Sequence, residues 1–350
     1  MKTLQLLSIV LVSGILISCE KEELFVTPDE NGIEETATNG KGFLFPSGPL
    51  DFTLQANSSN MGGFANHEIA LFKGNLWLVG GHNDHTPPYT SSSQVWASRN
   101  GKDWKLITEG LFPERHNHSL IVYKDQLWLI GGIDSSGEIL SDIWNSTDGV
   151  RWNRVTSLNP LVDIGQNNSV VFNERIFVFR GNGREKEEVW SSSDGSNWRL
   201  ETEAAFPVRN HYKTVVFNGF IYVYGGWLRD GGLTNEVWTS PDGRYWYQKP
   251  PATDIFAPRI NHSATVYDGY VWIIGGESWD ASGKRTFYGD IWYSENMKYW
   301  TRYEGKPPFY KGLHSHIGLS YKNELWVFGG YRPDGSLADV ATGKIWSIDQ

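Results

Sequence analysis

The chain has 350 residues, and its 31 basic residues against 40 acidic ones give a formal net charge of −9 at pH 7. No stretch gathers basic residues into a stripe that could follow a phosphate backbone, which argues against a nucleic-acid partner. The roughly 300 residues that follow the N-terminal segment are enough for one large all-β domain.

The N-terminal segment is typical of a bacterial lipoprotein. An apolar run from Leu4 to Ile17 follows Lys2 and ends just before Cys19, the single cysteine of the chain. The run is too short to span a bilayer and fits a secretory signal. The acidic stretch at residues 20–23 resembles the surface-export tag of Bacteroidetes lipoproteins, with a plain anchor that faces the periplasm as the alternative.

Three regions are therefore expected along the chain. Residues 1–18 form a lipoprotein signal peptide, residues 19–48 an acidic flexible tether with a lipidated Cys19, and residues 49–350 a folded domain. Between Glu20 and Lys41 the tether has seven acidic residues against two lysines, a composition that favours a solvated spacer. We expect an outer-membrane lipoprotein that contacts the membrane through its lipid only, exposed at the cell surface if the export tag is used.

The rest of the chain repeats one unit about every fifty residues. Each copy contains short apolar or alternating runs separated by turn residues, the signature of consecutive antiparallel strands. A glycine pair ends the second run, with a degenerate Arg180-Gly181 in the third copy: Gly80-Gly81, Gly131-Gly132, Gly225-Gly226, Gly275-Gly276 and Gly329-Gly330. A tryptophan marks the third run at Trp96, Trp144, Trp190, Trp238, Trp292 and Trp346. A further tryptophan follows eight residues later at Trp104, Trp152, Trp198, Trp246 and Trp300.

Such a period predicts a propeller, because one four-stranded sheet cannot bury both faces unless neighbouring sheets stack on it. The pattern resembles the kelch-repeat proteins over about residues 50–350. This resemblance implies an all-β, six-bladed β-propeller of four-stranded kelch-like blades. The turn S-x-D-G-x-x-W, as between Ser146 and Trp152, looks like a shortened form of the Asp-box turn of sialidase-type propellers. Propellers host many unrelated activities, so function has to come from the site.

The two ends of the chain are expected to close the ring. The sixth copy stops after Trp346 without a fourth run, and a spare run at residues 50–55 precedes the first copy. That run has Phe52 where the other copies have tryptophan. We expect it to complete the sixth blade as an N-terminal strand, which removes an exposed sheet edge and leaves a monomeric propeller.

All nine histidines fall in two sets of loops that open on one face of a kelch-like blade. One set leads into the innermost strand, and the other follows the glycine pair. One repeat position has histidine in four copies and differs in two: His67, His118, His262 and His316, against Asn167 and Tyr212. A shared position is as typical of structural hydrogen bonds between blades as of ligand binding, so both interpretations stay open.

Three of the loops that lead into an innermost strand contain an arginine, namely Arg115, Arg209 and Arg259. Arginine recognises carboxylate or sulfate groups with two parallel hydrogen bonds, so these residues predict an anion site. Further cations of this face are Arg180, Arg184, Arg229 and Arg332. The alternative is that the arginines pair with acids in neighbouring loops, such as Asp134, Asp230 or Glu277.

These positions define a predicted ligand-binding set: Arg115, His118, Arg209, Arg259, His262, His316, Trp227, Trp279 and Arg229. Trp227 and Trp279 are included because both fall in loops just after a glycine pair, whereas the other tryptophans are assigned to the core. The favoured function is a binding module for an acidic carbohydrate or a protein partner. The alternative is a sugar-active enzyme, either a mutarotase similar to the six-bladed kelch sialate epimerases or a polysaccharide lyase, with Tyr212 and His211 as acid and base.

No metal site or cofactor is expected. Histidines two or three residues apart, as at His116 and His118, could place two imidazoles together, but no carboxylate or thiol pattern completes a ligand set. Copper radical oxidases also use kelch blades, and their cofactor requires a crosslink between tyrosine and cysteine. The one cysteine of this chain is the predicted lipidation residue, which excludes copper oxidation.

Overall fold

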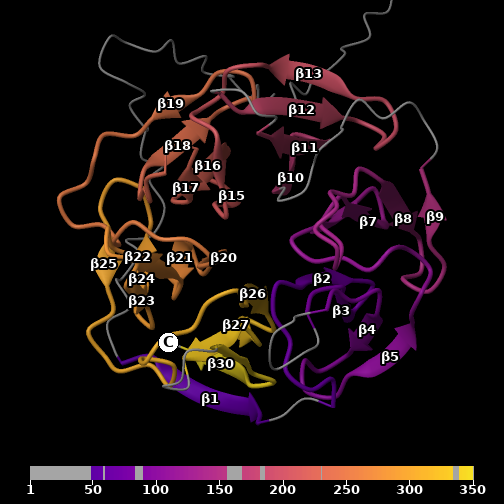
Figure 1. Ribbon diagram of the computed structural model, residues 1–350, viewed down its shortest axis with the longest axis horizontal. Helices are drawn as coiled ribbons and strands as arrows, with labels where there is room; N and C mark the ends of the chain where they lie inside the picture. Colours follow the sequence, from indigo (N-terminus) through magenta and orange to yellow (C-terminus); the bar gives the residue numbers. More distant parts are fainter. Residues whose placement is uncertain are drawn as a thin grey trace, which may run out of the picture. The chain divides into compact units, whose positions relative to one another are not determined.

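The computed structural model describes residues 49–57, 60–82, 90–155, 168–181, 186–229, 231–333 and 339–349. Within them, six four-stranded antiparallel sheets surround a central opening as the blades of a propeller (Figure 1). The predicted all-β, six-bladed fold is therefore confirmed. The predictions on the signal peptide, the tether and Cys19 fall on residues outside the described part. No described helix has the length and apolar character needed to cross a membrane.

Each blade runs outward from the central opening. The innermost strands are β2 (Glu68–Phe72), β6 (Ser119–Tyr123), β10 (Ser169–Phe172), β15 (Lys213–Phe217), β20 (Ser263–Tyr267) and β26 (Ile317–Tyr321). The second strands are β3 (Asn75–Val79), β7 (Gln126–Ile130), β11 (Arg175–Arg180), β16 (Phe220–Tyr224), β21 (Tyr270–Ile274) and β27 (Glu324–Phe328). The third strands are β4 (Val95–Ser98), β8 (Ile143–Ser146), β12 (Glu188–Ser192), β18 (Val237–Ser240), β24 (Ile291–Ser294) and β30 (Ile345–Asp349).

The outer strands are β5 (Lys105–Thr108), β9 (Asn153–Arg154), β13 (Arg199–Thr202), β19 (Tyr247–Gln248), β25 (Thr301–Arg302) and, in blade 6, β1 (Asp51–Ala56). The N-terminal strand β1 pairs with β30, from Asp51 opposite Asp349 to Leu54 opposite Trp346. Phe52 packs against Tyr303 and Phe309, at ring-centroid distances of 5.9 and 6.2 Å. The predicted closure of the ring by the N-terminal strand is thus confirmed.

Three short ribbons extend from the ends of the second strands at the glycine pairs. They are β14 (Arg209–Asn210) with β17 (Trp227–Leu228), β22 (Glu277–Trp279) with β23 (Arg285–Phe287), and β28 (Tyr331–Pro333) with β29 (Asp339–Ala341). We call the loops that lead into the innermost strands the leading loops. Because neighbouring strands are antiparallel, the leading loops and the segments after the glycine pairs lie at the same end of each blade. We call this end of the propeller the loop face.

The core lies between the blades. In each gap, side chains of adjacent sheets form an apolar cluster, as where Trp272 of blade 5 packs with Leu325 of blade 6. The tryptophans of the second strands are deeply buried, with Trp272 and Trp326 only 1% and 2% exposed. The third-strand tryptophans predicted to fill this space are half-buried. Their Nε1 atoms donate to side chains two residues earlier, as from Trp292 to Asp290.

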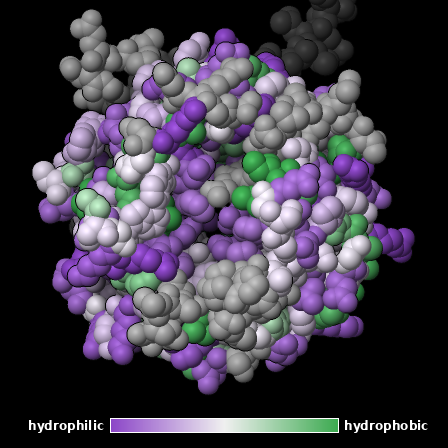
Figure 2. All heavy atoms as spheres, viewed as in Figure 1, coloured by the Kyte–Doolittle hydropathy of each residue, from purple (hydrophilic) through white to green (hydrophobic). Residues whose placement is uncertain are grey.

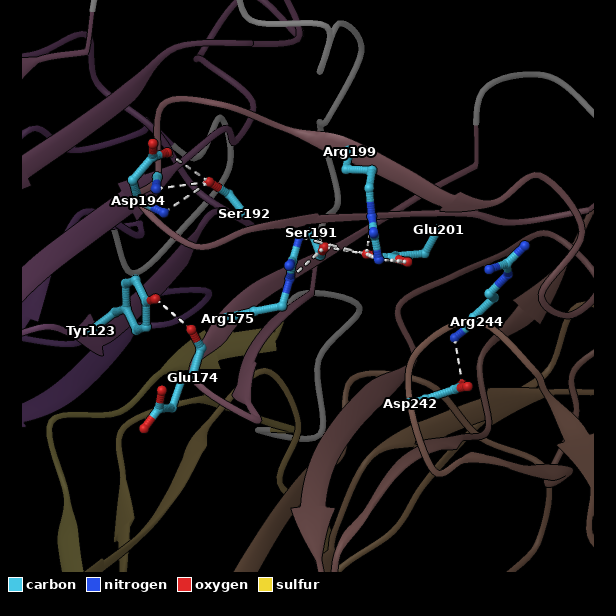
Figure 3. Close-up of polar contacts among 11 residues, drawn as sticks. Tyr123, Glu174, Arg175, Ser191, Ser192, Asp194, Arg199, Glu201, Asp242 and Arg244 are labelled. Carbon is cyan, nitrogen blue, oxygen red and sulfur yellow. Dashed lines mark hydrogen bonds and ion pairs between the residues drawn. The ribbon is translucent and has the colours of Figure 1, made fainter. Parts of the chain in front are cut away.

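The turns between third and fourth strands join one blade to the next. In blade 3 the Ser192 hydroxyl donates to the Asp194 carboxylate (Figure 3). The same hydroxyl accepts a bond from the Gly195 amide, and Asp194 accepts bonds from the amides of Ser196 and Asn197. Gly195 has φ +75°, and a Cβ there would overlap the Trp128 ring of blade 2. The glycine is therefore required both for the backbone conformation and for close packing of the neighbouring blade.

Candidate functional site

Arg259 is a structural residue of blade 5. Its side chain is completely buried, and its donors bind the carbonyls of Ala257 and Gly275 and both carboxylate oxygens of Asp290. The guanidinium lies 4.0 Å from the ring centroid of Tyr288. Burial opposes ionisation of Asp290, but the hydrogen bonds and charge of Arg259 outweigh it and lower the pKa of that carboxyl. The pair is therefore charged and fully hydrogen-bonded, as a buried ion pair must be.

Arg115 and Arg209 repeat this arrangement in blades 2 and 4. Arg115 pairs with Asp142, and Arg209 with Glu236, each at 2.7 Å. Neither arginine side chain is exposed. This is a correction to the predicted ligand-binding set, because the three guanidinium groups are buried and already satisfied by the protein. Pairing with acids was the alternative, but the partners lie within the same blade rather than at Asp134 or Glu277.

A sequence signal for this pairing was present and was missed. The acid partner stands two residues before the third-strand tryptophan in blades 2, 4 and 5. In blades 1 and 6 this position has Gln94 and Lys344, and the residues equivalent to the arginine are Phe64 and Leu313. In these five blades the arginine and the acid are therefore either both present or both absent. Blade 3 retains an acid at Glu188.

The predicted ligand residues His118, His262 and His316 lie between adjacent blades. Each is at most 1% exposed. Their imidazoles occupy the space left by the first glycine of the preceding blade, where a Cβ would come within 2.7 to 3.1 Å of the ring: Gly80, Gly225 and Gly275. Burial lowers the pKa of His316 to about 3 and those of the other two well below 6.5, so all three are neutral near pH 7. The geometry supports the structural interpretation of this repeat position.

In blade 3 the counterpart of His118 is Asn167, which lies outside the described residues. The first hairpins place Tyr123 opposite Gln126 in blade 2 and Phe172 opposite Arg175 in blade 3, so Asn168 is the counterpart of Ser119. Asn168 lines the central cavity.

Tyr212, the predicted catalytic residue, is tied into the junction between blades 3 and 4. It is 2% exposed, and its hydroxyl donates a 2.8 Å hydrogen bond to Glu187. Burial raises the pKa of Tyr212 well above 10 and that of Glu187 to about 8. A phenol that is buried and bound to a carboxyl has no access to a substrate proton, so the structure gives no support to its assigned role as acid or base.

The central opening contains a polar cavity of about 190 Å³. Figure 2 shows the hollow at the centre of the propeller, with hydrophilic residues around it. Its wall has two successive levels. One level is formed by the residues at the start of the innermost strands, opposite the residue before the glycine pair: Glu68, Ser119, Asn168, Lys213, Ser263 and Ile317. The other, nearer the loop face, includes Asn66, Asn117, His211, Asn261 and Ser315.

The second level is a ring held by the backbone. Its residues have positive φ angles between 51° and 56°. The amide of Ser315 donates to the carbonyl of Asn261, that of Asn66 to Ser315, and that of Asn117 to Asn66. These bonds run from blade to blade around the opening. Asparagine tolerates this left-handed conformation better than most residues, which explains its recurrence here.

A charged cluster missed by the sequence analysis adjoins this ring. Glu277, only 4% exposed, accepts hydrogen bonds from Asn261 and Arg285, and His314 lies 3.3 Å from its carboxylate. Burial lowers the pKa of His211 to about 4, against the opposing attraction of Glu277. The cluster connects blades 4, 5 and 6, and no single repeat position marks it, because its members come from the leading loops and from the segment after a glycine pair.

A second cluster on the loop face joins blades 1, 2 and 6. The rings of His82 and His116 lie 4.3 Å apart. The Nδ1 atom of His82 is 3.0 Å from the Tyr331 hydroxyl, and that of His116 is 2.8 Å from Ser91 Oγ. Among the described residues, no group of three histidines, cysteines or acids is arranged to hold a metal ion.

The predicted residues Trp227 and Trp279 do come together on the loop face. Their rings lie 4.4 Å apart although they belong to the ribbons of different blades, and both are half-buried. In the register of β22 with β23, Trp279 stands opposite Arg285. Arg229, the last member of the predicted set, follows β17 and is exposed. We call Trp227, Arg229, Trp279 and Arg285 the loop-face platform.

The fold and its repeat positions define a kelch-type β-propeller, a class that generally serves as a binding or protein-interaction module. The family model described as the Attractin/LZTR1 beta-propeller matches residues 76–341. The chain belongs to this propeller family. The solved structure titled "Structure of YjhT" shares the fold, with a TM-score of 0.67 at 13% identity over 85% of this chain and 100% of that one.

Two relatives show the propeller within much longer proteins. Beta-scruin of Limulus polyphemus is 23% identical over 290 residues, which cover 78% of this chain and 26% of scruin. Multiple epidermal growth factor-like domains protein 8 of Homo sapiens is 31% identical over 168 residues, which cover 44% of this chain and 6% of that protein. The chain thus spans about a quarter or less of these relatives.

Proposed function

We propose that this propeller is a binding module that holds an acidic carbohydrate on its loop-face platform. The observation that carries the proposal is the pairing of Trp227 with Trp279 at 4.4 Å beside Arg285. Ligand sites combine aromatic surface with a few placed polar groups, and guanidinium groups favour carboxylate and sulfate partners. Arg115, Arg209 and Arg259 are buried and are not part of the proposed binding site.

The platform suits a saccharide because its apolar and charged groups alternate over two neighbouring ribbons. The Trp279 ring can pack against the C–H face of a sugar ring. Arg285 and Arg229 belong to the same platform and can bind an acidic substituent of that sugar. Arg285 also binds Glu277, which holds its guanidinium in place over the Phe287 ring at 4.6 Å. An arginine positioned in this way loses less side-chain entropy when it binds an anion.

Titration with uronic, sialic and sulfated oligosaccharides tests the proposal, with neutral oligosaccharides of equal length beside them. We expect acidic chains to bind, and Trp279→Ala and Arg285→Ala each to weaken binding about tenfold or more, since a charge-assisted hydrogen bond contributes roughly 1.5–3 kcal/mol. Tyr299→Ala is the matched control, because this aromatic residue is 67% exposed on blade 5 away from the ribbons. Absence of binding across the panel, or equal loss in the control, would exclude the platform.

The enzyme alternative is tested by Tyr212→Phe. The hydroxyl donates to Glu187 inside the protein, so its removal should leave saccharide affinity within about twofold. If wild-type protein converts a sialic acid or cleaves a uronic-acid polymer, and Tyr212→Phe abolishes that turnover while the fold is kept, the protein is an enzyme and the binding proposal is incomplete.

We also propose that Cys19 anchors the protein to the outer membrane by a lipid. The support is the apolar run from Leu4 to Ile17 directly before it. Cys19→Ala should move the protein from the membrane fraction to the soluble fraction, or leave it unprocessed. Protease treatment of whole cells separates display at the surface from a periplasmic orientation.

A further inference from the structure

The wall of the central cavity contains two opposite charges that the repeat does not require. At the start of the innermost strand, blades 2 and 5 have Ser119 and Ser263, and blade 3 has Asn168. Blade 1 has Glu68 and blade 4 has Lys213. Blades 1 and 4 face each other across the ring of six, with β2 and β15 on opposite sides of the opening (Figure 1).

Both charged side chains line the cavity, and each retains part of its surface for the channel. No ion pair joins them, and no hydrogen bond satisfies either charged group within the described parts of blades 1 to 6. Most other buried or half-buried charges described above have partners, including Arg259, Arg180 and Glu277. Unpartnered charges in a narrow channel are expensive, because the protein replaces much of their hydration.

Electrostatic effects indicate how these charges lie. Burial is the main cause of the low pKa values of His67, His262 and His316, and the charge of Lys213 lowers each of them further. This agrees with the position of Lys213 in the wall of the central cavity. Burial raises the pKa of Glu68 to about 7, and the attraction of Lys213 opposes this rise.

The surrounding groups are suited to a polar guest. The side chains of Asn66, Asn117 and His211 line the cavity and are half-buried, so they present polar groups to a molecule inside it. The volume of about 190 Å³ is below the roughly 300–1,000 Å³ of sites that enclose drug-sized ligands, which limits the guest to a small metabolite.

We propose that the cavity binds a small zwitterion of the amino-acid class, with its ammonium group toward Glu68 and its carboxylate toward Lys213. A single zwitterion can pair with Glu68 and Lys213 at once, whereas an anion or a cation would leave one of these two residues unpaired. Ser119, Asn168 and Ser263 of blades 2, 3 and 5 supply further polar groups between the two ends. This site lies in the channel and is independent of the loop-face platform.

The test is calorimetric titration at pH 8 with ω-amino acids from glycine to 6-aminohexanoate. Each is compared with a carboxylate and an amine of the same chain length. We expect one amino acid to bind at least tenfold more tightly than both of its singly charged analogues. Glu68→Ser and Lys213→Ser should each remove this preference, because serine occupies the same position in blades 2 and 5 and is compatible with the fold.

Ile317→Ser is the matched control, since it adds a serine to the same level without changing a charge, and it should retain the preference. If no amino acid exceeds its analogues with the wild-type protein, the proposal is wrong, whatever the variants do. The proposal is also wrong if Glu68 and Lys213 only stabilise the fold through their mutual attraction. In that case the single variants would lower the melting temperature, the double variant Glu68→Ser/Lys213→Ser would restore it, and no amino acid would shift it.

Discussion

In blade 5 the arginine that pairs with the acid before the tryptophan comes from the leading loop, whereas in blade 3 it comes from the end of the second strand. Arg180 takes the position of the first glycine and lies 3.4 Å from Glu188. Arg259 reaches Asp290 from the opposite side and also binds the carbonyl of Gly275. The acid is neutralised in both blades, but only blade 5 keeps the glycine.

The junctions that follow these blades differ in the same way. Between blades 5 and 6, the small Gly275 leaves room for the neutral imidazole of His316. Between blades 3 and 4, where Arg180 replaces the glycine, the residue at the histidine position is Tyr212, bound to Glu187. The comparison shows that the arginine and the acid form one coupled unit within a blade. The first glycine and the histidine of the next blade form a separate one, because blades 1 and 6 keep Gly80 with His118 and Gly329 with His67 although they lack the arginine and the acid.

The largest effect is expected from breaking the unit in blade 5. Arg259→Leu leaves Asp290 buried without its partner, which should lower the free energy of unfolding by about 3–5 kcal/mol. Urea unfolding measures this loss. Blade 6 supplies the control, because it has Leu313 and Lys344 at the two positions. Arg259→Leu/Asp290→Lys should therefore recover at least half of the stability, and no recovery would mean that charge pairing is not what couples the positions.

A smaller, pH-dependent effect on stability is expected at the junction between blades 3 and 4, where Tyr212 takes the place of the histidine. The pKa of Glu187 is raised from 4.5 to about 8 in the folded protein, so its contribution is complete below pH 4.5 and is lost as the pH rises to about 8. From pH 5 to pH 8 the wild type should lose up to about 4 kcal/mol more than Glu187→Gln, which cannot ionise. Glu68, whose pKa is raised to about 7, acts in the same direction in both proteins and cancels in the difference. Parallel pH profiles for the two proteins would contradict a neutral Glu187.

The smallest effect is expected at a regular junction. Burial keeps the pKa of His262 well below 6.5, so the unfolded chain binds a proton that the folded one does not as the pH falls below 6.5. Between pH 7 and pH 5 the wild type should lose up to about 2 kcal/mol more than His262→Asn. Asparagine is the natural residue at this position in blade 3, as Asn167. If the variant shows the same acid sensitivity, His262 is not held neutral by the junction.

Much of the fold could be predicted from the sequence because it depends on local, repeated patterns. Glycine pairs, tryptophans and Asp-Gly turns recur at fixed intervals, and each reports strand or turn geometry within one blade. The spare run with Phe52 was identified as the missing strand by the same counting. The loop position of Trp227 and Trp279 likewise separated them from the core tryptophans.

The role of each charged residue could not be decided in this way. Arg259 on an outer rim would bind anions, but the same residue turned inward binds Asp290, and the sequence is identical in both cases. Likewise, the column of histidines could not show that each ring fills the space of a glycine in another blade. Composition and repeat position determine which residues reach a region, whereas side-chain direction and burial depend on packing between blades.

By itself, the sequence determined a closed six-bladed ring, because the period, the turn chemistry and the missing strand are all encoded within single repeats. Only the tertiary structure decided that Arg115, Arg209 and Arg259 are buried, that Trp227 lies beside Trp279, and that Glu68 faces Lys213. These relations join residues of different strands, loops or blades, and they arise when closure of the ring brings side chains from distant parts of the chain to one axis and one face. Their energies depend on burial and distance, which no single repeat contains.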